Sequence, residues 1–565
     1  MPAMAADYVI VGAGSAGCVL ANRLSADPTV SVILLEAGGR DRNPWIHIPV
    51  GYFKTMHDPK VDWRYRTEPD PGLNGRQLDW PRGKVLGGSS SLNGLLYVRG
   101  QPEDYDRWRQ MGSPGWGWDD VLPLFKRSEK QERGADEYHG DDGPLCVSNM
   151  RLQRPICDAW IAAAQTMGYP FNPDYNGATQ EGVGHFQLTA DRGRRCSSAV
   201  AFLNPARARP NLTVLTHAQT EKVLIEDGRA TGVRYRDISG ALKTVSARAE
   251  VILSAGAIGS PQILMCSGVG EAAQLRSHGI EVQKDLFGVG KNLQDHLQAR
   301  LVFKCKEPTL NDEVRSLYGK ARIALKYALF RAGPMTMAAS LATGFVRTGD
   351  HVATPDIQFH IQPWSADSPG TGVHPFSAFT VSVCQLRPES RGEIRLAAPD
   401  ISVYPKIHPN YLATQTDCRT LVDGVNIARR IARTAPLAGK IAQAFRPSDD
   451  LAMDDYDGTL NWARNNSTSI YHPVGTCKMG SGADAVVDAR LRVHGINGLR
   501  VADCSIMPEI VSGNTNAPAI MIGEKASDLV LEDRRSGPTR KTPVSRKMTS
   551  RPLDNAKEQA VEDDH

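Results

Sequence analysis

The sequence predicts an α/β (α+β) fold with more than one domain, and three observations lead to this prediction. The chain has 565 residues, whereas single hydrophobic cores rarely grow past about 250–300 residues. Residues 7–35 follow the order strand, glycine turn, helix and strand, which is that of a βαβ unit. Later segments alternate apolar and polar side chains between Gly/Pro turns, a pattern typical of antiparallel strands.

The N-terminal unit begins with a short buried strand at residues 7–11, DYVIV, that runs directly into glycines. Residues 15–26 then place apolar side chains at helical spacing. A second apolar strand is predicted at residues 30–35. The unit therefore resembles the start of a Rossmann-like, doubly wound domain.

Glycines between the first strand and the helix form a G-x-G-x-x-G pattern. Such a turn lets the backbone approach a pyrophosphate, and the helix N-terminus offers free N–H groups to it. Glu36 ends the second strand, where a carboxylate can accept hydrogen bonds from ribose hydroxyls, so NADP is disfavoured. The pattern does not separate FAD from NAD, and by itself it also matches a plain glycine-rich turn. The candidate nucleotide-binding residues here are Gly12, Gly14, Ser15, Ala16, Gly17 and Glu36.

The middle of the chain mixes strands and helices. Residues 212–237 alternate like an antiparallel meander with a turn at Asp227-Gly228, and residues 249–270 predict another strand, a glycine turn and a helix. Residues 301–460 carry no nucleotide signature but contain the probable strand DIQFHIQPW and a helix over 417–432, which favours a substrate-covering domain. Residues 534–565 have many charges and no aromatic side chain, so we expect a disordered tail.

Composition limits the classes of function. The 66 basic and 62 acidic side chains leave a net charge of +4, too small to recruit nucleic acid. Ten cysteines occur singly without metal-ligand spacing, which indicates reduced thiols and no metal site. The N-terminus lacks a secretory pattern and no run reaches about 18 apolar residues. We therefore expect a soluble cytoplasmic protein, with peripheral contact to the inner membrane left open.

Four longer motifs carry a family resemblance. GKVLGGSSSLNGLLYVRG (residues 83–100) and GAIGSPQILMCSGVG (256–270) are followed near the end by YHPVGTCKMG (471–480) and VADCSIMPEIVSGNTNAP (501–518). In this order they resemble the signatures of the glucose–methanol–choline oxidoreductase family. The chain is most similar to choline-dehydrogenase-type FAD alcohol dehydrogenases of bacteria.

The resemblance implies an FAD-binding domain assembled from separated segments, with an inserted substrate domain of antiparallel sheet and helices. The predicted FAD-binding segments are 5–155, 201–300 and 461–533. The predicted substrate segments are 156–200 and 301–460, and the tail is 534–565.

The resemblance also implies positions for the cofactor. Gly88 and Ser89 would let the backbone run beside the flavin and the diphosphate, and Asn93 and Gly94 would contact the flavin. Some relatives attach FAD through a histidine where this chain has Leu92; because leucine has no nucleophile, we expect non-covalent FAD. Further implied cofactor contacts are Val223, whose backbone would meet the adenine, Asp503 and Asn516.

Catalytic roles come from the same resemblance. Oxidising an alcohol with a flavin as hydride acceptor leaves the protein to supply a base. His472 matches the family's active-site histidine and Asn514 its partner, whose amide can donate to the substrate oxygen. His360 matches a substrate-side histidine. Taken alone, His472 is equally a turn residue before proline, Asn514 part of an Asx turn and His360 a filler of one strand face.

The predicted function is oxidation of a primary alcohol to the aldehyde, with electrons passed to a quinone-type acceptor or to oxygen. Two other classes remain open: a hydroxynitrile lyase or light-driven flavoenzyme on the same fold, and a non-catalytic flavin-binding module. His472 argues against the light-driven decarboxylase, whose lineage lacks that histidine. Choline would need an anionic or aromatic cage, which the sequence does not reveal, so the alcohol and the oligomeric state stay undetermined.

Overall fold

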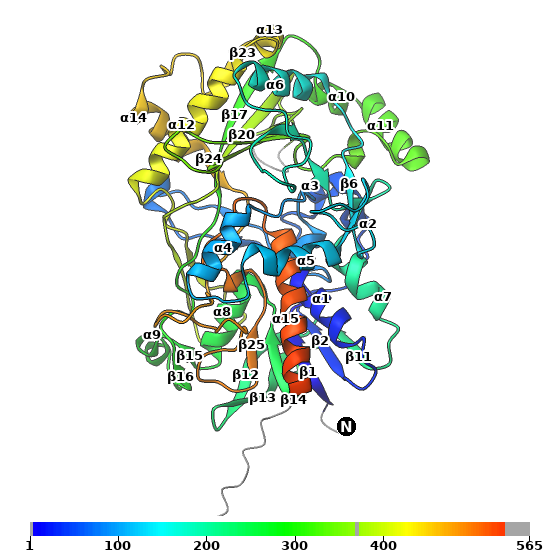
Figure 1. The fold of residues 1–565 in the computed structure, drawn as a ribbon, viewed down its shortest axis with the longest axis vertical. Coiled ribbons are helices and arrows are strands. Elements are labelled where there is room, and N and C mark those ends of the chain that lie inside the picture. The colour runs from blue at the N-terminus through cyan, green and yellow to red at the C-terminus, as the bar shows by residue number, and fades with distance from the viewer. Residues whose placement is uncertain (1–3, 368–371, 537–565) are drawn as a thin grey trace, which may run out of the picture.

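The computed structural model describes residues 4–367 and 372–536. It confirms the mixed α/β prediction, with two seven-stranded sheets in one molecule. Figure 1 shows them at opposite ends of the long axis, with the first sheet (β1, β2, β12, β13, β14, β25) below and the second (β17, β20) above. None of the described helices has both the length and the apolar character needed to cross a bilayer.

The first sheet contains the predicted N-terminal unit. Its central strands are parallel, whereas β12, β13 and β14 form an antiparallel extension. Its strands, in spatial order, are β11 (Leu212–Thr216), β2 (Val32–Glu36), β1 (Met4–Val11), β14 (Leu242–Leu253), β13 (Arg229–Arg236) and β12 (Gln219–Glu226), with β25 (Leu499–Val501) beside β14.

Helices from both ends of the chain cover this sheet. α1 (Ser15–Leu24) packs against α15 (Asn516–Ser536), and Figure 1 shows α15 running along the middle of the molecule. The buried Glu524 carboxylate on α15 pairs with Arg23 on α1 at 2.7 Å and with Arg127 on α5 (Trp118–Ser128) at 2.8 Å. A buried carboxylate needs such partners, so the chain's two ends are joined through one ionic cluster.

The second sheet is antiparallel throughout and both its faces are buried at the centre. α12 (Gln415–Ala432) covers one face, where strand residues such as Phe359 and Val383 pack. The opposite face of this sheet borders a cavity that is described below. Its strands, in spatial order, are β23 (Ile441–Arg446), β17 (Leu297–Cys305), β20 (Ala378–Gln385), β19 (Ile357–Gln362), β18 (Ala342–Val346) and β7 (Gly182–His185), with β24 (Ser467–Ser469) beside β17.

Three details differ from the predictions made from the sequence. β11 does not belong to an antiparallel meander, because it pairs in parallel with β2; alternation predicts a strand but not its partner. The predicted boundary at 300/301 falls inside β17, and β24, expected in an FAD-binding segment, extends the second sheet. α15 continues to Ser536, so residues 534–536 of the expected tail are helical, and 537–565 lie outside the described residues.

Candidate active site

One cavity lies between the two sheets and collects fourteen of the sixteen predicted site residues. Segments that are far apart in the sequence build it: the turn after β1, the loop around residues 82–96, the turn after β14, strand β19 and the C-terminal motifs. The predicted residues that line it are Gly12, Gly14, Ser15, Ala16, Glu36, Gly88, Ser89, Asn93, Gly94, His360, His472, Asp503, Asn514 and Asn516.

The glycine turn has the form that a diphosphate requires. A Cβ on Gly12, whose φ is +99°, would lie 2.5 Å from the Ser254 carbonyl oxygen, and one on Gly17 would lie 1.9 Å from the Gly12 carbonyl oxygen. Both positions therefore exclude side chains. Gly14 caps α1 without a side-chain hydrogen bond, so the first amides of the helix face the cavity ready for an anion.

Glu36 has a structural role as well as a binding one. Its two carboxylate oxygens accept hydrogen bonds from the Ala13 amide at 2.9 Å and the Gly38 amide at 2.8 Å. Burial raises the pKa of this carboxyl to about 7, although the two amides oppose the shift. The carboxyl group thus holds the glycine turn in place and still borders the cavity where a ribose would lie.

The remaining cofactor candidates surround the same end of the cavity. Ser15 Oγ donates to Asn516 Oδ1 at 2.8 Å, linking the first turns of α1 and α15. Asp503 accepts from the Gly256 amide at 2.9 Å and from Ser260 Oγ at 2.6 Å, which ties it to the start of α8 (Gly256–Cys266).

Gly17 and Val223 are the two predicted residues that do not line the cavity. Gly17 packs on the turn itself, consistent with its expected part in helix–strand packing. The Val223 amide donates to Ser267 Oγ at 2.8 Å inside the protein, and its place at the cavity is taken by Ala218, Gln219 and Thr220. The proposed adenine contact of Val223 is therefore not carried forward.

His472 is part of a hydrogen-bonded chain that the sequence did not predict. His472 Nδ1 lies 3.0 Å from His296 Nδ1, and His296 Nε2 lies 2.9 Å from the Leu386 carbonyl oxygen. A carbonyl oxygen only accepts, so His296 Nε2 carries a proton. Burial lowers the pKa of His296 to about 4, so the ring is neutral near pH 7 and its Nδ1 accepts the Nδ1–H of His472.

This assignment leaves Nε2 of His472 without a proton. Asn514 Nδ2 lies 3.2 Å from that atom, in position to donate to its lone pair. Asn514 Oδ1 in turn lies 3.4 Å from Gln358 Nε2 on β19. Burial, reinforced by His296, His360 and Arg82, holds the pKa of His472 well below its usual range. The site therefore presents a neutral imidazole with its lone pair beside the Asn514 amide.

The segment that carries His472 is held by a buried aspartate. Asp295 Oδ1 accepts the His472 amide at 2.6 Å, and its Oδ2 accepts Ser469 Oγ at 2.6 Å and the Tyr411 hydroxyl. Burial raises the pKa of Asp295 to about 6, against the effect of these bonds. Tyr471, just before the histidine, adopts φ +68°, an uncommon conformation for a bulky residue.

His360 lies on the cavity face of β19, stacked on Phe186 with ring centroids 5.5 Å apart. Its Nδ1 has no hydrogen-bond partner among the described residues, and burial lowers the pKa of the ring to about 3. The ring therefore borders the cavity while its Nδ1 is itself buried without a partner, which is a costly arrangement for a polar atom.

Asp295, His296 and Gln358 are the site residues that were missed. The only local signal was the run QDH directly before an alternating strand. Nothing in that run indicates a histidine 176 residues away in the sequence.

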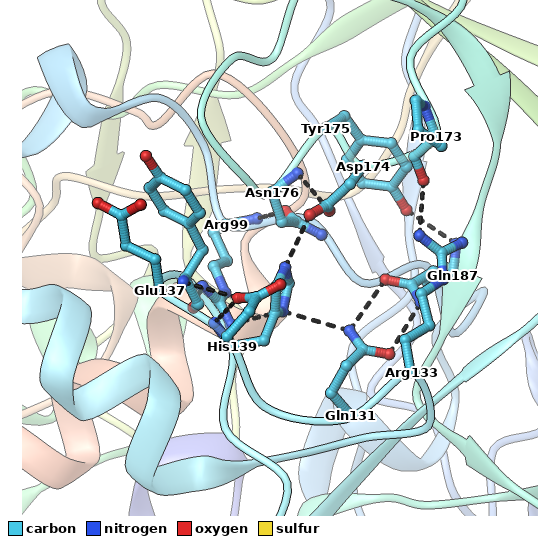
Figure 2. Close-up of polar contacts among 12 residues, drawn as sticks. Arg99, Gln131, Arg133, Glu137, His139, Pro173, Asp174, Tyr175, Asn176 and Gln187 are labelled. Atoms are coloured by element: carbon cyan, nitrogen blue, oxygen red, sulfur yellow. Dashed lines mark hydrogen bonds and ion pairs between the residues drawn. The ribbon is translucent and has the colours of Figure 1, made fainter.

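A second cluster, outside the cavity, has the composition of a metal site. Side-chain ligand atoms of Asp136, His139 and Asp174 lie within 4.8 Å of one another, and Figure 2 shows His139 between Gln131 and Asp174. Burial opposes a charge on His139, but hydrogen bonds to Asp174 and Glu129 raise its pKa to about 9. Both ring nitrogens of His139 are engaged by carboxylates, Nδ1 by Glu129 and Nε2 by Asp174, each at 2.9 Å, which is the arrangement of an ionic network.

Comparison with known proteins agrees with this architecture. GMC oxidoreductase sequence models match residues 6–298 and 388–523, which is more than half of the chain. The chain belongs to the GMC oxidoreductase family. The resemblance noted in the sequence is thus confirmed, and with it the FAD cofactor. The glycine turn and the start of α1, whose first amides receive no side-chain cap, are suited to bind it. The protein is an FAD-dependent oxidoreductase acting on CH–OH donors.

Its relatives span bacteria and mammals. The chain is 44% identical over 529 residues to an alcohol dehydrogenase [acceptor] of Pseudomonas putida, covering 93% of this chain and 95% of the relative. It is 43% identical to mitochondrial choline dehydrogenase of Mus musculus, covering 93% and 90%. Among solved structures, pyridoxine 4-oxidase from Mesorbium loti has a TM-score of 0.84 at 31% identity, over 94% and 99% of the two chains. Formate oxidase has a TM-score of 0.87 at 27% identity, over 95% and 100%.

Proposed function

We propose that the protein oxidises a primary alcohol to the aldehyde, with His472 as the base that takes the hydroxyl proton. The observation that carries this proposal is the chain Leu386–His296–His472, which leaves His472 Nε2 as a lone pair at the cavity. A neutral imidazole in a dry site is a suitable acceptor for a hydroxyl proton.

The roles of the neighbouring residues follow from their positions. The Asn514 amide donates toward the point where the alcohol oxygen lies against His472, and this stabilises the negative charge that develops there. His360, with its unpartnered Nδ1, borders the same space from β19. Bound FAD supplies the hydride acceptor. The glycine turn, Glu36, Gly88 and Asn516 would hold the cofactor. Leu92 lines the same cavity, so non-covalent attachment remains our prediction.

Two features of the proposal concern its alternatives and the electron acceptor. A hydroxynitrile lyase would also use a histidine base, so it is the second candidate, whereas a light-driven reaction would leave the His296–His472–Asn514 chain unused. We propose a quinone-type acceptor over oxygen. The relative from Pseudomonas putida is named a dehydrogenase with an unspecified acceptor, whereas another relative is named an oxygen-dependent choline dehydrogenase.

Anaerobic reduction of the bound flavin tests this function. We expect a panel of primary alcohols, choline included, to bleach the oxidised-flavin absorbance of the purified protein, because proton removal by His472 permits hydride transfer. Readmission of air should restore the band slowly, whereas added quinone should restore it rapidly. A flavin that no alcohol bleaches, together with release of cyanide from a cyanohydrin, would instead support the lyase.

A further inference from the structure

Arg300 is a buried cation on the cavity face of the second sheet. It lies on β17 and borders the cavity with its strand neighbour Gln298. Across the sheet, Arg300 pairs with Ser382 on β20, and Ser382 pairs with His360 on β19. Paired residues of adjacent strands share one face, and strands lie about 4.8 Å apart. The backbone of Arg300 is therefore roughly 10 Å from that of His360, on the same side of the sheet.

The guanidinium has no carboxylate partner in the part of the chain that the structure describes. Its contacts are a long hydrogen bond to Gln362 Oε1, 3.4 Å, and the ring of Trp364, whose centroid lies 6.0 Å away. Neither contact neutralises the charge. Burial lowers the pKa of Arg300, and the nearby Asp367 opposes that shift, but Asp367 forms its ion pair with Arg446. Because an arginine stays protonated at any accessible pH, the cavity lining contains a cation with no ion-pair partner among the described residues.

Acidic groups are confined to the other end of the cavity. Among the described residues, its only carboxylates are Glu36 and Asp503, and both accept hydrogen bonds from the nucleotide-binding turns. Around Arg300 the lining offers amides such as Gln298 and Gln362 and aromatic rings such as Trp364, but no carboxylate among the described residues. Aromatic rings alone can hold a quaternary ammonium, but the cation of Arg300 beside them repels one.

We propose that Arg300 binds an anionic oxygen group, such as a carboxylate, at the far end of the substrate. This rests on the proposed function, because the alcohol end must lie at His472 while the anion lies at Arg300. The guanidinium is suited to a carboxylate since it can donate two parallel hydrogen bonds. The preferred substrates are therefore ω-hydroxycarboxylates rather than choline or the matching unsubstituted alcohols.

Paired substrates test this assignment. Anaerobic flavin reduction should show a higher kcat/KM for ω-hydroxycarboxylates than for 1-alkanols of equal length, and the lowest for choline. In Arg300→Gln the ratio of hydroxy-acid to alkanol kcat/KM should fall by about 10- to 100-fold, as loss of a charged hydrogen bond implies. Lys304→Gln, a cation on the same strand outside the cavity, should leave the ratio unchanged.

The outcomes separate the two proposals. If alkanols reduce the flavin but hydroxy acids react no better, or if Arg300→Gln leaves the ratio unchanged, the anion site is wrong and alcohol oxidation stands. If no alcohol of any charge reduces the flavin, the proposed function itself fails. Arg300→Lys keeps the positive charge but cannot donate two parallel hydrogen bonds, so its ratio of hydroxy-acid to alkanol kcat/KM should be intermediate.

An independent observation concerns α11 (Leu317–Phe330). Figure 1 shows this helix at the outer edge of the upper half of the molecule. It is attached through Gly319, Ile323 and Tyr327, yet it exposes more large apolar side chains than any other described helix. Their exposed fractions are 84% for Leu317, 79% for Tyr318, 60% for Leu325, 64% for Leu329 and 69% for Phe330.

The helix has the charge pattern of a membrane-surface segment. At 100° per residue, Tyr318, Leu325 and Leu329 share a face that points away from Ile323. Arg322 and Lys326 lie along one edge of that face, whereas Lys320 lies on the other side of the helix. The helix contains no acidic residue. We infer that α11 lies on an anionic lipid bilayer, with its apolar face among the acyl chains and Arg322 and Lys326, at the edge of that face, at the headgroups.

Vesicle sedimentation of the full chain tests this docking. We expect binding to phosphatidylcholine vesicles that contain phosphatidylglycerol and much weaker binding to phosphatidylcholine alone, because Arg322 and Lys326 pair with anionic headgroups. Leu325→Ser combined with Leu329→Ser should reduce the bound fraction several-fold, while Ile238→Ser, at a 79% exposed position in another loop, should not. Equal binding by the double variant would overturn the inference, as would a dimer that the double variant abolishes, since α11 would then contact a second copy.

Discussion

Replacement of His472 by alanine should lower kcat/KM for the alcohol by about 10²- to 10⁴-fold, the usual contribution of a positioned base. The loss is expected in flavin reduction itself, because no other described side chain presents a neutral imidazole nitrogen beside Asn514. FAD binding should survive, since the glycine turn and Glu36 do not depend on the histidine. Anaerobic stopped-flow absorbance measures the reduction rate, and the visible spectrum measures the cofactor content.

The control for this variant is another histidine replaced in the same way. His494, whose Nε2 bonds the Gly480 carbonyl oxygen away from the cavity, should tolerate alanine with a near-normal rate. Near-normal reduction by His472→Ala would remove His472 from the role of base. Loss of bound FAD in His472→Ala would show that His472 has a structural role and is not the base that accepts the proton.

Replacement of His296 by alanine should lower the same rate by about 10²-fold or more, although His296 does not line the cavity. Without the acceptor at 3.0 Å, the imidazole of His472 is free to rotate and to place its proton on Nε2, which abolishes the base. Disturbing the tautomer of a catalytic histidine is known to cost up to about 10⁴-fold in a serine protease. His296 is thus a positioning residue.

The pH profile distinguishes this role from a merely structural one. In the wild type the pKa of His472 lies well below 6.5, so the base stays unprotonated and the rate should not fall as pH drops through 6.5. His296 contributes to that low pKa, so its removal should raise the pKa and move the loss of rate on the acid side to higher pH. His296→Asn, which offers an amide oxygen as the acceptor, should recover much of the rate. Equal rates and profiles for both variants and the wild type would contradict the proposed chain.

Short-range patterns predicted the parts of the site that are contiguous in the sequence. The strand, the three glycines, the helix and Glu36 lie within thirty-odd residues, and the close packing around Gly12 and Gly17 requires glycine whatever surrounds the turn. The strand containing His360 was also predictable from local sequence, because its alternation IQFHIQ places polar side chains on one face. Long motifs at residues 83–100 and 471–518 then led to the family and the cofactor.

Pairings between distant segments could not be predicted in this way. β11 was assigned correctly to a strand but with the wrong neighbour, and Val223 lies on a strand at a position away from the cavity, since a strand's pattern specifies which side chains are buried and not what covers them. The partner of His472 is 176 residues away, and only the register of β17 with β20 and β19 brings Arg300 to the face of His360.

The sequence alone therefore determined the α/β class, the nucleotide turn, the FAD-dependent family and fourteen of the residues that line the cavity, because these depend on local geometry or on contiguous motifs. Tertiary structure decided which nitrogen of His472 carries the lone pair, the charge of the cavity lining at Arg300 and the exposure of α11. Each of these depends on the neighbours of a side chain: a carbonyl that fixes a tautomer, a missing carboxylate within the described chain, or an apolar face that no other element covers.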